Sequence, residues 1–324
     1  MTTLFQISAR RVPGLQRALL GWYDANRRDL PWRKSCEPYR IWLSEIMLQQ
    51  TRVAAVLLHY DKFLKRFPTV HKLAAAREPA VLAQWSGLGY YRRARNLHAA
   101  AKLIVQQRGG GFPKSAQDLL GLPGIGRYTA AAIASIAFNE PVAVLDGNVE
   151  RVLRRLFGGA PALAELWDAA ESLLDHTRPG DFNQAMMELG ALICLPSQPS
   201  CSECPIRPYC RTRGAGQKAT AKFRQHKRHA TYLLARRAQS VRLVQRSGDE
   251  RLMPGMWELP QVLNPAAPNQ RLFSVKHSIT ITNFTVNVVT GRSGRGNWVQ
   301  ISRLQRLPLT GLARKILRKA AIIQ

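Results

Sequence analysis

The stretch CLPSQPSCSECPIRPYC, residues 194–210, holds four of the five cysteines of this 324-residue chain. Six, two and five residues separate Cys194, Cys201, Cys204 and Cys210. Disulfides are disfavoured, because nothing in the chain suggests export. Zinc ligands usually form two short pairs separated by a longer stretch, whereas a cube-shaped iron-sulfur cluster takes one thiolate at each corner and tolerates this spacing. From spacing alone, zinc and an iron-sulfur cluster both stay open.

The charge of the chain predicts a polyanionic partner. Lys and Arg number 48 against 20 Asp and Glu, a formal net charge of +28, and no acidic residue follows Glu258. Distributed Lys and Arg bind nucleic acid by releasing counterions from phosphates. A membrane surface is the weaker alternative, since no apolar run is long enough to span a bilayer and no signal peptide is recognisable. We therefore expect an intracellular DNA- or RNA-binding protein, and we expect a monomer because no heptad seam is present.

The hydrophobic pattern changes once along the chain. Apolar residues recur at helical spacing from Pro13 to about Gly190, with breaks at Gly and Pro. Later runs such as SITITNFTVNVVT alternate with a period typical of strands. We expect a helical domain, a basic linker and a small α+β domain, over residues 1–213, 214–228 and 229–324.

A short glycine-containing turn, LPGIGRYTA at residues 122–130, precedes an alanine-rich helix. Gly124 and Gly126 allow a tight turn whose backbone N–H groups can bind a phosphate at the helix N-terminus. An ordinary turn between two helices is the alternative. Tyr128 follows the second glycine by two residues, and Asp146 lies eighteen residues further on.

Two carboxylates have sequence surroundings that suit acid-base chemistry. Glu45, in IWLSEIMLQQT, has the apolar helical neighbours Ile41 and Leu48. Burial there without a cationic partner would raise its pKa and make it a general acid. Asp146 precedes a helix expected to begin near Asn148, where N–H groups and the helix dipole favour the ionised form. An exposed Glu and a plain N-cap are the alternatives; a neutral acid beside an anion instead suits cleavage of an N-glycosidic bond.

Together these motifs resemble the endonuclease III family of DNA repair glycosylases, which share a helix-hairpin-helix. The resemblance implies a mainly α fold with a six-helix barrel module and an iron-sulfur module, and DNA contacts at Gly124 and Gly126. It also implies a [4Fe-4S] cluster on Cys194, Cys201, Cys204 and Cys210, whose loop offers Arg207, Arg211 and Arg213 to DNA. Cys36 is expected to be a free thiol without a role.

One position departs from the bifunctional members of that family. They carry a Lys that forms a Schiff base where this chain has Tyr128. A phenol cannot form an imine with the sugar. The resemblance therefore implies a monofunctional glycosylase that removes a base and leaves the strand largely uncut.

Longer stretches resemble the family members that act on adenine: the segment beginning RRDLPWRK at Arg27, then GLGYYRRARNL, LDGNV and FNQAMMELGALIC, within about residues 10 to 215. This implies excision of adenine mispaired with 8-oxoguanine or guanine in double-stranded DNA, in a bacterial cytoplasm at the nucleoid. The implied residues are Glu45, Asp146, Asn148 and Tyr128 for catalysis, Arg28, Trp32, Arg33, Leu48 and Gln184 for the adenine pocket, and Gln50 and Tyr90 for wedging the duplex.

LMPGMWELP, residues 252–260, resembles the MutT-like domain of those members. No Nudix hydrolase signature follows, so we expect lesion recognition without pyrophosphatase activity. Where the family has a Phe-Ser-His loop, this chain has Ile279, Thr280 and Ile281. Thr280 keeps a hydroxyl for contact with the lesion, and His277 and Ser278 are alternative probes.

Two other functions stay open from the sequence. One is a mismatch glycosylase of the same family that removes thymine or uracil opposite guanine. The other is a noncatalytic iron-sulfur protein that only binds DNA.

Overall fold

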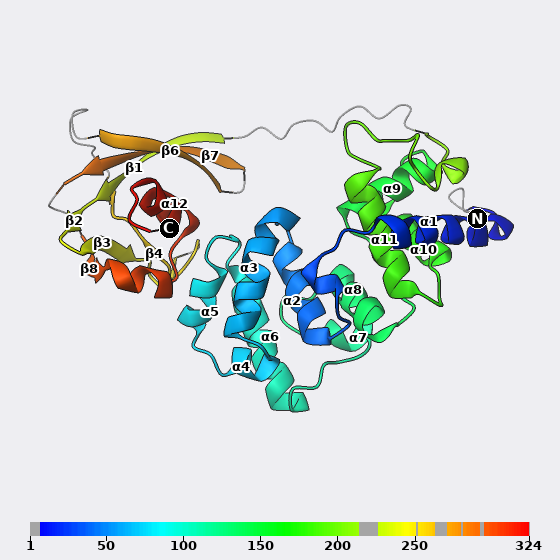
Figure 1. Cartoon of the computed structure of the whole chain (residues 1–324), viewed down its shortest axis with the longest axis horizontal. Coiled ribbons are helices and arrows are strands. Elements are labelled where there is room, and N and C mark those ends of the chain that lie inside the picture. Colours follow the sequence, from blue (N-terminus) through cyan, green and yellow to red (C-terminus); the bar gives the residue numbers. More distant parts are fainter. Residues whose placement is uncertain are drawn as a thin grey trace. The chain divides into compact units, whose positions relative to one another are not determined.

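The computed structural model describes residues 7–213, 226–250, 252–262, 271–279, 281–291 and 295–323. The chain forms two compact units, each built from two separate stretches: the described residues up to 50 with 103–213, and residues 51–102 with the described residues from 226 onward (Figure 1). This division differs from the expected boundaries, because helices in 51–102 hydrogen bond with the C-terminal part. The boundaries at 213 and 229 themselves stay predictions.

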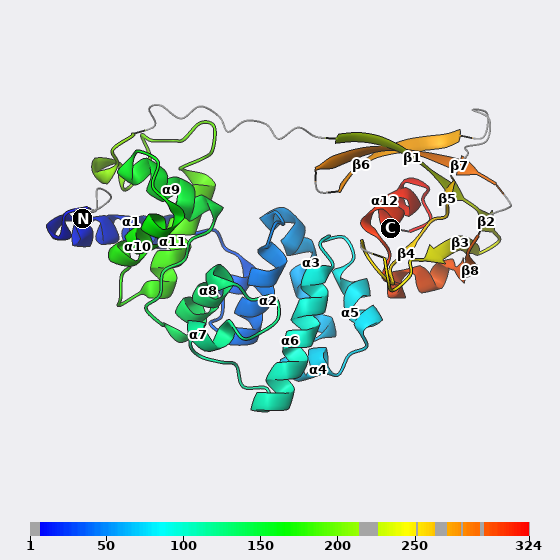
Figure 2. The same ribbon diagram turned by 180° about the vertical axis from the view of Figure 1, so that it is seen from behind.

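The first unit is helical, as the periodicity predicts. Helix α11 contacts α1, α8 and α9, while α2 packs on α8 and α10 packs on α9 (Figures 1 and 2). The elements are η1 (Ala9–Arg11), α1 (Val12–Asn26), η2 (Pro31–Arg33), α2 (Pro38–Leu48), α7 (Ala116–Leu119), α8 (Arg127–Phe138), α9 (Gly147–Phe157), α10 (Leu163–Leu173), α11 (Pro179–Leu192) and η3 (Arg207–Tyr209).

Helix α9 shows how the apolar pattern becomes packing. Val149, Val152 and Leu156 recur at helical spacing and are buried in the core of this unit. Asp146 begins the helix by accepting backbone N–H bonds, so the predicted N-cap is confirmed. This cap places the Asp146 carboxyl at the end of a helix whose opposite face is fixed in the core.

Two glycines let α11 approach its neighbours closely. A Cβ at Gly180 would lie 2.6 Å from the carbonyl oxygen of Ser135 in α8, and one at Gly190 would lie 2.7 Å from Cβ of Asn148 in α9. Any side chain at either position therefore forces two helices apart.

We expect Gly190→Ala to lower the free energy of unfolding by about 1–3 kcal/mol, because the added methyl group meets Asn148 and its backbone. Urea unfolding measures this. Gly21→Ala is the matched control: Gly21 lies in α1 with nothing within 4 Å of its Cβ, so alanine there should raise stability by up to about 1 kcal/mol. Equal stability of the two variants would contradict a close crossing.

The second unit combines helices with two small sheets. Its helices from the first stretch are α3 (Val53–Arg66), α4 (Val70–Ala74), α5 (Glu78–Trp85) and most of α6 (Arg92–Arg108). The C-terminal stretch adds β1 (His226–Leu234), β2 (Arg236–Arg237), β3 (Ser240–Gln245), β4 (Trp257–Glu258), β5 (Gln261–Val262), β6 (Arg271–Ile279), β7 (Thr282–Thr290), β8 (Asn297–Gln300), η5 (Ile301–Arg306) and α12 (Gly311–Lys319).

The small C-terminal domain is mixed, as predicted. One sheet has the order β5-β1-β7-β6, with β1 and β7 parallel, and in the other β3 pairs with β2, β4 and β8. Helix α12 lies between the two sheets (Figure 1), and its Ile316 and Leu317 are completely buried. The apolar residues along one face of α12, an otherwise basic helix, thus complete the hydrophobic core of this domain.

The first strand of the C-terminal domain starts three residues before the expected domain start at residue 229. Strand β1 begins at His226, which pairs with Thr282 of β7, and the parallel ladder continues to Leu234. The first residues of β1 are polar or basic, and they adopt strand structure because the backbone of β7 forms hydrogen bonds with theirs. Residues 214–225 lie outside the described part of the chain.

Across the described ranges, no helix combines the length and the apolar character that crossing a membrane requires.

Candidate active site and cysteine pocket

Glu45 lies on α2 and is 6% exposed, as its apolar flanks predict. The Tyr128 hydroxyl donates a hydrogen bond of 2.9 Å to its Oε2. Burial raises the pKa of Glu45 to about 7; the Tyr128 bond opposes the rise, and the nearby charge of Asp146 adds to it. Near neutral pH the protonated and the ionised form of the Glu45 carboxyl are therefore both populated, so it can donate a proton and afterwards accept one.

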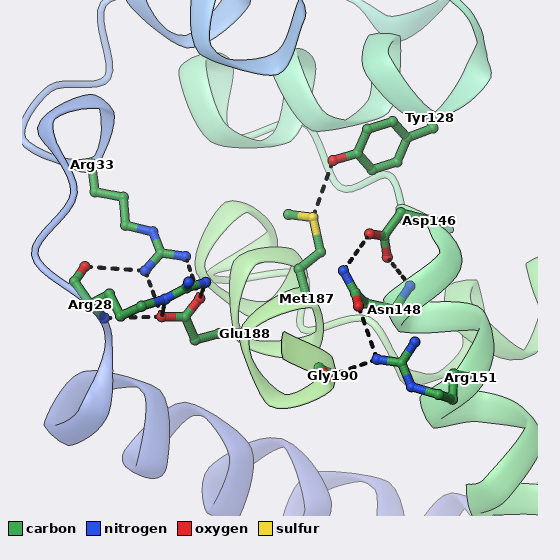
Figure 3. Close-up of polar contacts among 9 residues, drawn as sticks. All are labelled: Arg28, Arg33, Tyr128, Asp146, Asn148, Arg151, Met187, Glu188 and Gly190. Carbon is green, nitrogen blue, oxygen red and sulfur yellow. Dashed lines mark hydrogen bonds and ion pairs between the residues drawn. The ribbon is translucent and has the colours of Figure 1, made fainter. Parts of the chain in front are cut away.

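Asp146 is half-buried at the start of α9. Its Oδ1 accepts from the backbone N–H groups of Asn148 at 2.9 Å and Val149 at 2.8 Å, and its Oδ2 accepts from the Asn148 side chain at 2.9 Å (Figure 3). The sequence predicted that the helix end would favour the ionised form of Asp146. The hydrogen bonds do lower its pKa, but burial outweighs them, and the pKa is raised from its usual value.

Tyr128 connects the two sides of this region. Besides Glu45, its hydroxyl contacts Sδ of Met187 on α11 at 3.2 Å (Figure 3). Burial and the Glu45 carboxyl raise the pKa of the phenol well above its usual value, so Tyr128 stays protonated and donates. No amine occupies this position.

Glu188, which the sequence did not single out, holds two of the predicted pocket residues in place. Its carboxylate, 1% exposed, accepts bonds of 2.6 Å from Nη2 of Arg28 and 2.9 Å from Nη2 of Arg33 (Figure 3). Burial alone would raise the pKa of Glu188, but these hydrogen bonds lower it to about 2. The available signal was an acidic residue among the apolar, buried positions of α11.

Arg151, also missed, joins Asn148 to the cysteine loop. Its Nη2 donates to Oδ1 of Asn148 at 2.9 Å and to the carbonyl of Gly190 at 2.7 Å (Figure 3). Its Nε donates to the carbonyl of Cys194 at 2.8 Å. The amide of Asn148 is thereby oriented with its NH₂ group toward Asp146.

Three further predicted pocket residues lie on the same elements. Trp32 is buried in the η2 turn beside Arg33, Leu48 ends α2 one turn after Glu45, and Gln184 precedes Glu188 by one turn of α11. Each is therefore carried by an element that also carries one of the central side chains. Their roles stay predictions.

The two residues predicted to wedge the duplex share a backbone property. Gln50 and Tyr90 have φ angles of 54° and 48°, in the left-handed region that favours glycine. Gln50 is exposed, and Tyr90 is 46% exposed. Strained conformations at exposed side chains are often found at functional positions. Gln50 and Tyr90 belong to different units, and their roles stay predictions.

The hairpin before α8 has the predicted open N-terminus. Gly124 has a φ of 80°, and Gly126 is the N-cap residue of α8, where no side chain caps the first turn. Both glycines are exposed, while Leu122 and Ile125 anchor the turn in the interior. Backbone N–H groups at such a helix end can bind a phosphate.

Four cysteines line one pocket, together with Arg155, Arg207 and Ile206. None of the five cysteines forms a disulfide; Cys36 is a free thiol, as expected, and it is exposed. In the part of the chain that the structure describes, no group of three or more His, Cys, Asp or Glu is arranged around one metal ion. The shared pocket is compatible with a metal ion or an iron-sulfur cluster bound by these cysteines.

The surroundings of the cysteines fit an anionic group. Arg155 is 4% exposed; its Nη1 contacts Sγ of Cys194 at 3.2 Å and the carbonyl of Leu195 at 2.6 Å. A buried guanidinium in contact with Cys194 supplies positive charge that would offset the charge of an anionic group held by the cysteines. Arg207, Arg211 and Arg213 of the same loop are exposed.

The expected lesion probe lies mostly outside the described residues. Thr280 is not among them, and of Ile279 only the backbone is described, as the last residue of β6. Of the alternatives, Ser278 is exposed and donates to Oδ1 of Asn283 at 2.6 Å. His277 is half-buried beside α12, where burial lowers its pKa. No lesion contact is assigned to either residue.

Residues 43–169, which include Glu45, the hairpin and Asp146, match the family described as HhH-GPD superfamily base excision DNA repair protein. A solved thermostable thymine-DNA glycosylase shares 30% identity and a TM-score of 0.60, over 64% of this chain and 98% of that one. The chain therefore belongs to the HhH-GPD superfamily of base excision DNA repair proteins.

Within that superfamily the chain is similar to proteins named adenine DNA glycosylase. The Rattus norvegicus protein is 48% identical over 215 residues, 62% of this chain and 42% of its own length. The Arabidopsis thaliana protein is 40% identical over 299 residues, 77% of this chain and 47% of its own length. The chain thus spans less than half the length of these two relatives.

Proposed function

We propose that this protein is a monofunctional adenine DNA glycosylase of base excision repair, which excises adenine mispaired with 8-oxoguanine or guanine in double-stranded DNA. The names of its relatives support adenine as the excised base. The net charge of +28 supports binding to DNA. The five cysteines, none in a disulfide, support action inside the cell.

One observation carries the proposal: a buried carboxyl with a pKa of about 7, hydrogen bonded by Tyr128 and within electrostatic reach of Asp146. Cleavage of an N-glycosidic bond requires a proton for the departing base and negative charge beside the oxocarbenium-like sugar. In our proposal Glu45 protonates the adenine and then helps to activate water. Asp146 stabilises the sugar cation or traps it covalently, and Asn148 supports Asp146.

The pocket residues have distinct parts in this proposal. Arg28 and Arg33 are fixed by Glu188, so their side chains are ordered before the base enters. Trp32, Leu48 and Gln184 complete the pocket for the extruded base. Outside it, the exposed Gln50 and Tyr90 fill the space that the base leaves, which offsets the cost of unstacking.

We also propose that Cys194, Cys201, Cys204 and Cys210 hold a [4Fe-4S] cluster. The group would link four points of the 194–210 loop and so fix its arginines for contact with phosphates. Arg155 would balance its negative charge. The MutT-like recognition of the base opposite adenine, with Thr280 as the expected probe, is likewise a proposal.

The decisive experiment is release of free adenine under single-turnover conditions. We expect release from duplexes with adenine opposite 8-oxoguanine or guanine, and none from an adenine:thymine duplex. Because Tyr128 cannot form an imine, borohydride should trap little covalent adduct. Absence of adenine release, or strong trapping, would contradict the proposal.

A thymine:guanine duplex belongs in the same assay. The solved structure with 30% identity is a thymine-DNA glycosylase, which favours thymine removal as the second candidate. Thymine release without adenine release would establish that alternative.

The excision rate should fall as pH rises through about 7, because Glu45 must be protonated and burial raises its pKa to that value. Above it, the protonated fraction falls about tenfold per pH unit. Single-turnover rates at saturating protein, from about pH 6 to 8.5 at constant ionic strength, measure this. A rate that increases over the same range would exclude Glu45 as the acid.

A further inference from the structure

The segment between α5 and α6 has an unusual backbone. Gly87 and Gly89 have φ angles of 114° and 71°, and Tyr90, which is not a glycine, has a φ of 48°. A tyrosine keeps such a conformation only where its surroundings hold it. With 46% of its side chain exposed, Tyr90 is not held by its own burial.

Arg93, in the first turn of α6, forms hydrogen bonds with this segment. Its Nη2 donates to the carbonyls of Leu88 at 3.2 Å and Gly89 at 3.3 Å, and to Oγ1 of Thr51 at 2.9 Å. Its guanidinium lies 5.5 Å from the ring centroid of Tyr90. Arg93 thus fixes the two backbone carbonyls that precede Tyr90.

A carbonyl of the C-terminal domain also contacts the segment. The hydroxyls of Ser86 and Tyr91 both donate to the Leu309 carbonyl, at 2.6 and 3.2 Å. Arg314 of α12 donates from Nε to Oγ of Ser86 at 3.1 Å. Ser86, Tyr91 and Leu309 are 2%, 4% and 0% exposed. The two hydroxyls use both acceptor positions of one buried carbonyl.

The C-terminal domain holds this carbonyl in place by its own bonds. Trp257 of β4 donates to the carbonyl of Pro308 and accepts from the N–H of Thr310, at 2.8 and 2.9 Å. Thr310 also caps α12 by accepting from Ala313. Leu309 therefore cannot shift without disturbing a strand and a helix of that domain.

We propose that Leu309 and Arg314 are positioning residues through which the C-terminal domain holds Tyr90 in the conformation needed for base extrusion. The bonded positions, Ser86 and Tyr91, enclose Tyr90 in the sequence, so a domain that holds both restricts the backbone between them. Contiguous hydrogen-bonded groups of this kind couple distant parts of a protein. The inference rests on the proposed function only for its last step, adenine release.

The test replaces Arg314 by methionine, which keeps the alkyl chain and removes the donor to Ser86. We expect slower extrusion, read as a smaller fluorescence rise from 2-aminopurine placed opposite 8-oxoguanine. We also expect excision to slow by about tenfold, the effect of losing one buried bond from a charged donor. Arg314→Lys, which restores a donor, should recover most of both signals.

The control is Arg303→Met, which likewise removes one arginine charge from the C-terminal domain, at an exposed position of η5. It should leave extrusion and melting temperature near those of the wild type. A double-mutant cycle then tests the route. If Arg314 acts through Tyr90, then Arg314→Met should add little to the defect of Tyr90→Ala.

The outcomes separate the two proposals. Equal fluorescence and excision for Arg314→Met and Arg303→Met, or additive effects with Tyr90→Ala, would overturn the inference while wild-type adenine release still stood. Without wild-type release the proposed function is contradicted, and the fluorescence alone decides the inference. Should Arg314→Met fail to fold, Tyr91→Phe, which removes one hydroxyl from the same carbonyl, replaces it.

Discussion

Glu45→Gln is expected to lower the single-turnover rate of adenine release by roughly 10³-fold, within the range for loss of a general acid. Glutamine has nearly the same shape, and its carbonyl can accept the Tyr128 hydrogen bond that Oε2 of Glu45 accepts now. The local packing around the 6% exposed side chain should therefore persist. What disappears is a group that can release a proton near neutral pH.

Glu150→Gln is the matched control. Glu150 lies on α9 and pairs with Arg154 at a partly exposed position, where an ion pair contributes little to stability. We expect wild-type excision from it, and DNA affinity similar for both variants. Excision by Glu45→Gln at the rate of the control would remove Glu45 from the mechanism.

Asp146→Asn is expected to lower the rate by about 10²- to 10³-fold, the usual effect of removing one electrostatic contact to a charged transition state. The change removes the negative charge and places an NH₂ group among three donors, so one hydrogen bond with Asn148 or Val149 is lost. The pKa of Glu45 should also fall, because the charge of Asp146 contributes to its rise.

Melting temperature distinguishes a catalytic role from a structural one in this variant. Asparagine is about as good an N-cap as aspartate, so α9 should remain intact and the melting temperature nearly unchanged. Loss of stability in proportion to loss of rate would instead reduce Asp146 to a capping residue.

Local patterns predicted much of this protein. Burial of Glu45 followed from its apolar flanks, and the N-cap at Asp146 from a polar residue before an amphipathic helix. The cysteine spacing predicted a common pocket. Each of these features depends on residues within about two helical turns or one loop, where periodicity and turn chemistry are informative.

Features that depend on distant pairs escaped prediction. Glu188 meets Arg28 across 160 residues, and Ser86 meets Leu309 across 223. No periodicity connects such positions, because the pairing arises only once helices and sheets have packed. The raised pKa of Asp146 was not foreseen for the same reason: the helix end, which favours the ionised form, was visible in the sequence, but the burial that raises the pKa was not.

The interleaving of the two units along the chain limits how such proteins can be recombined. The C-terminal stretch belongs to the same unit as residues 51–102, although more than 100 residues of the other unit separate the two stretches in the sequence. A chimera that exchanged residues 226–323 alone would set a foreign carbonyl against the native Ser86 and Tyr91. A graft that kept these contacts matched would include both stretches, residues 51–102 and the C-terminal part of the chain.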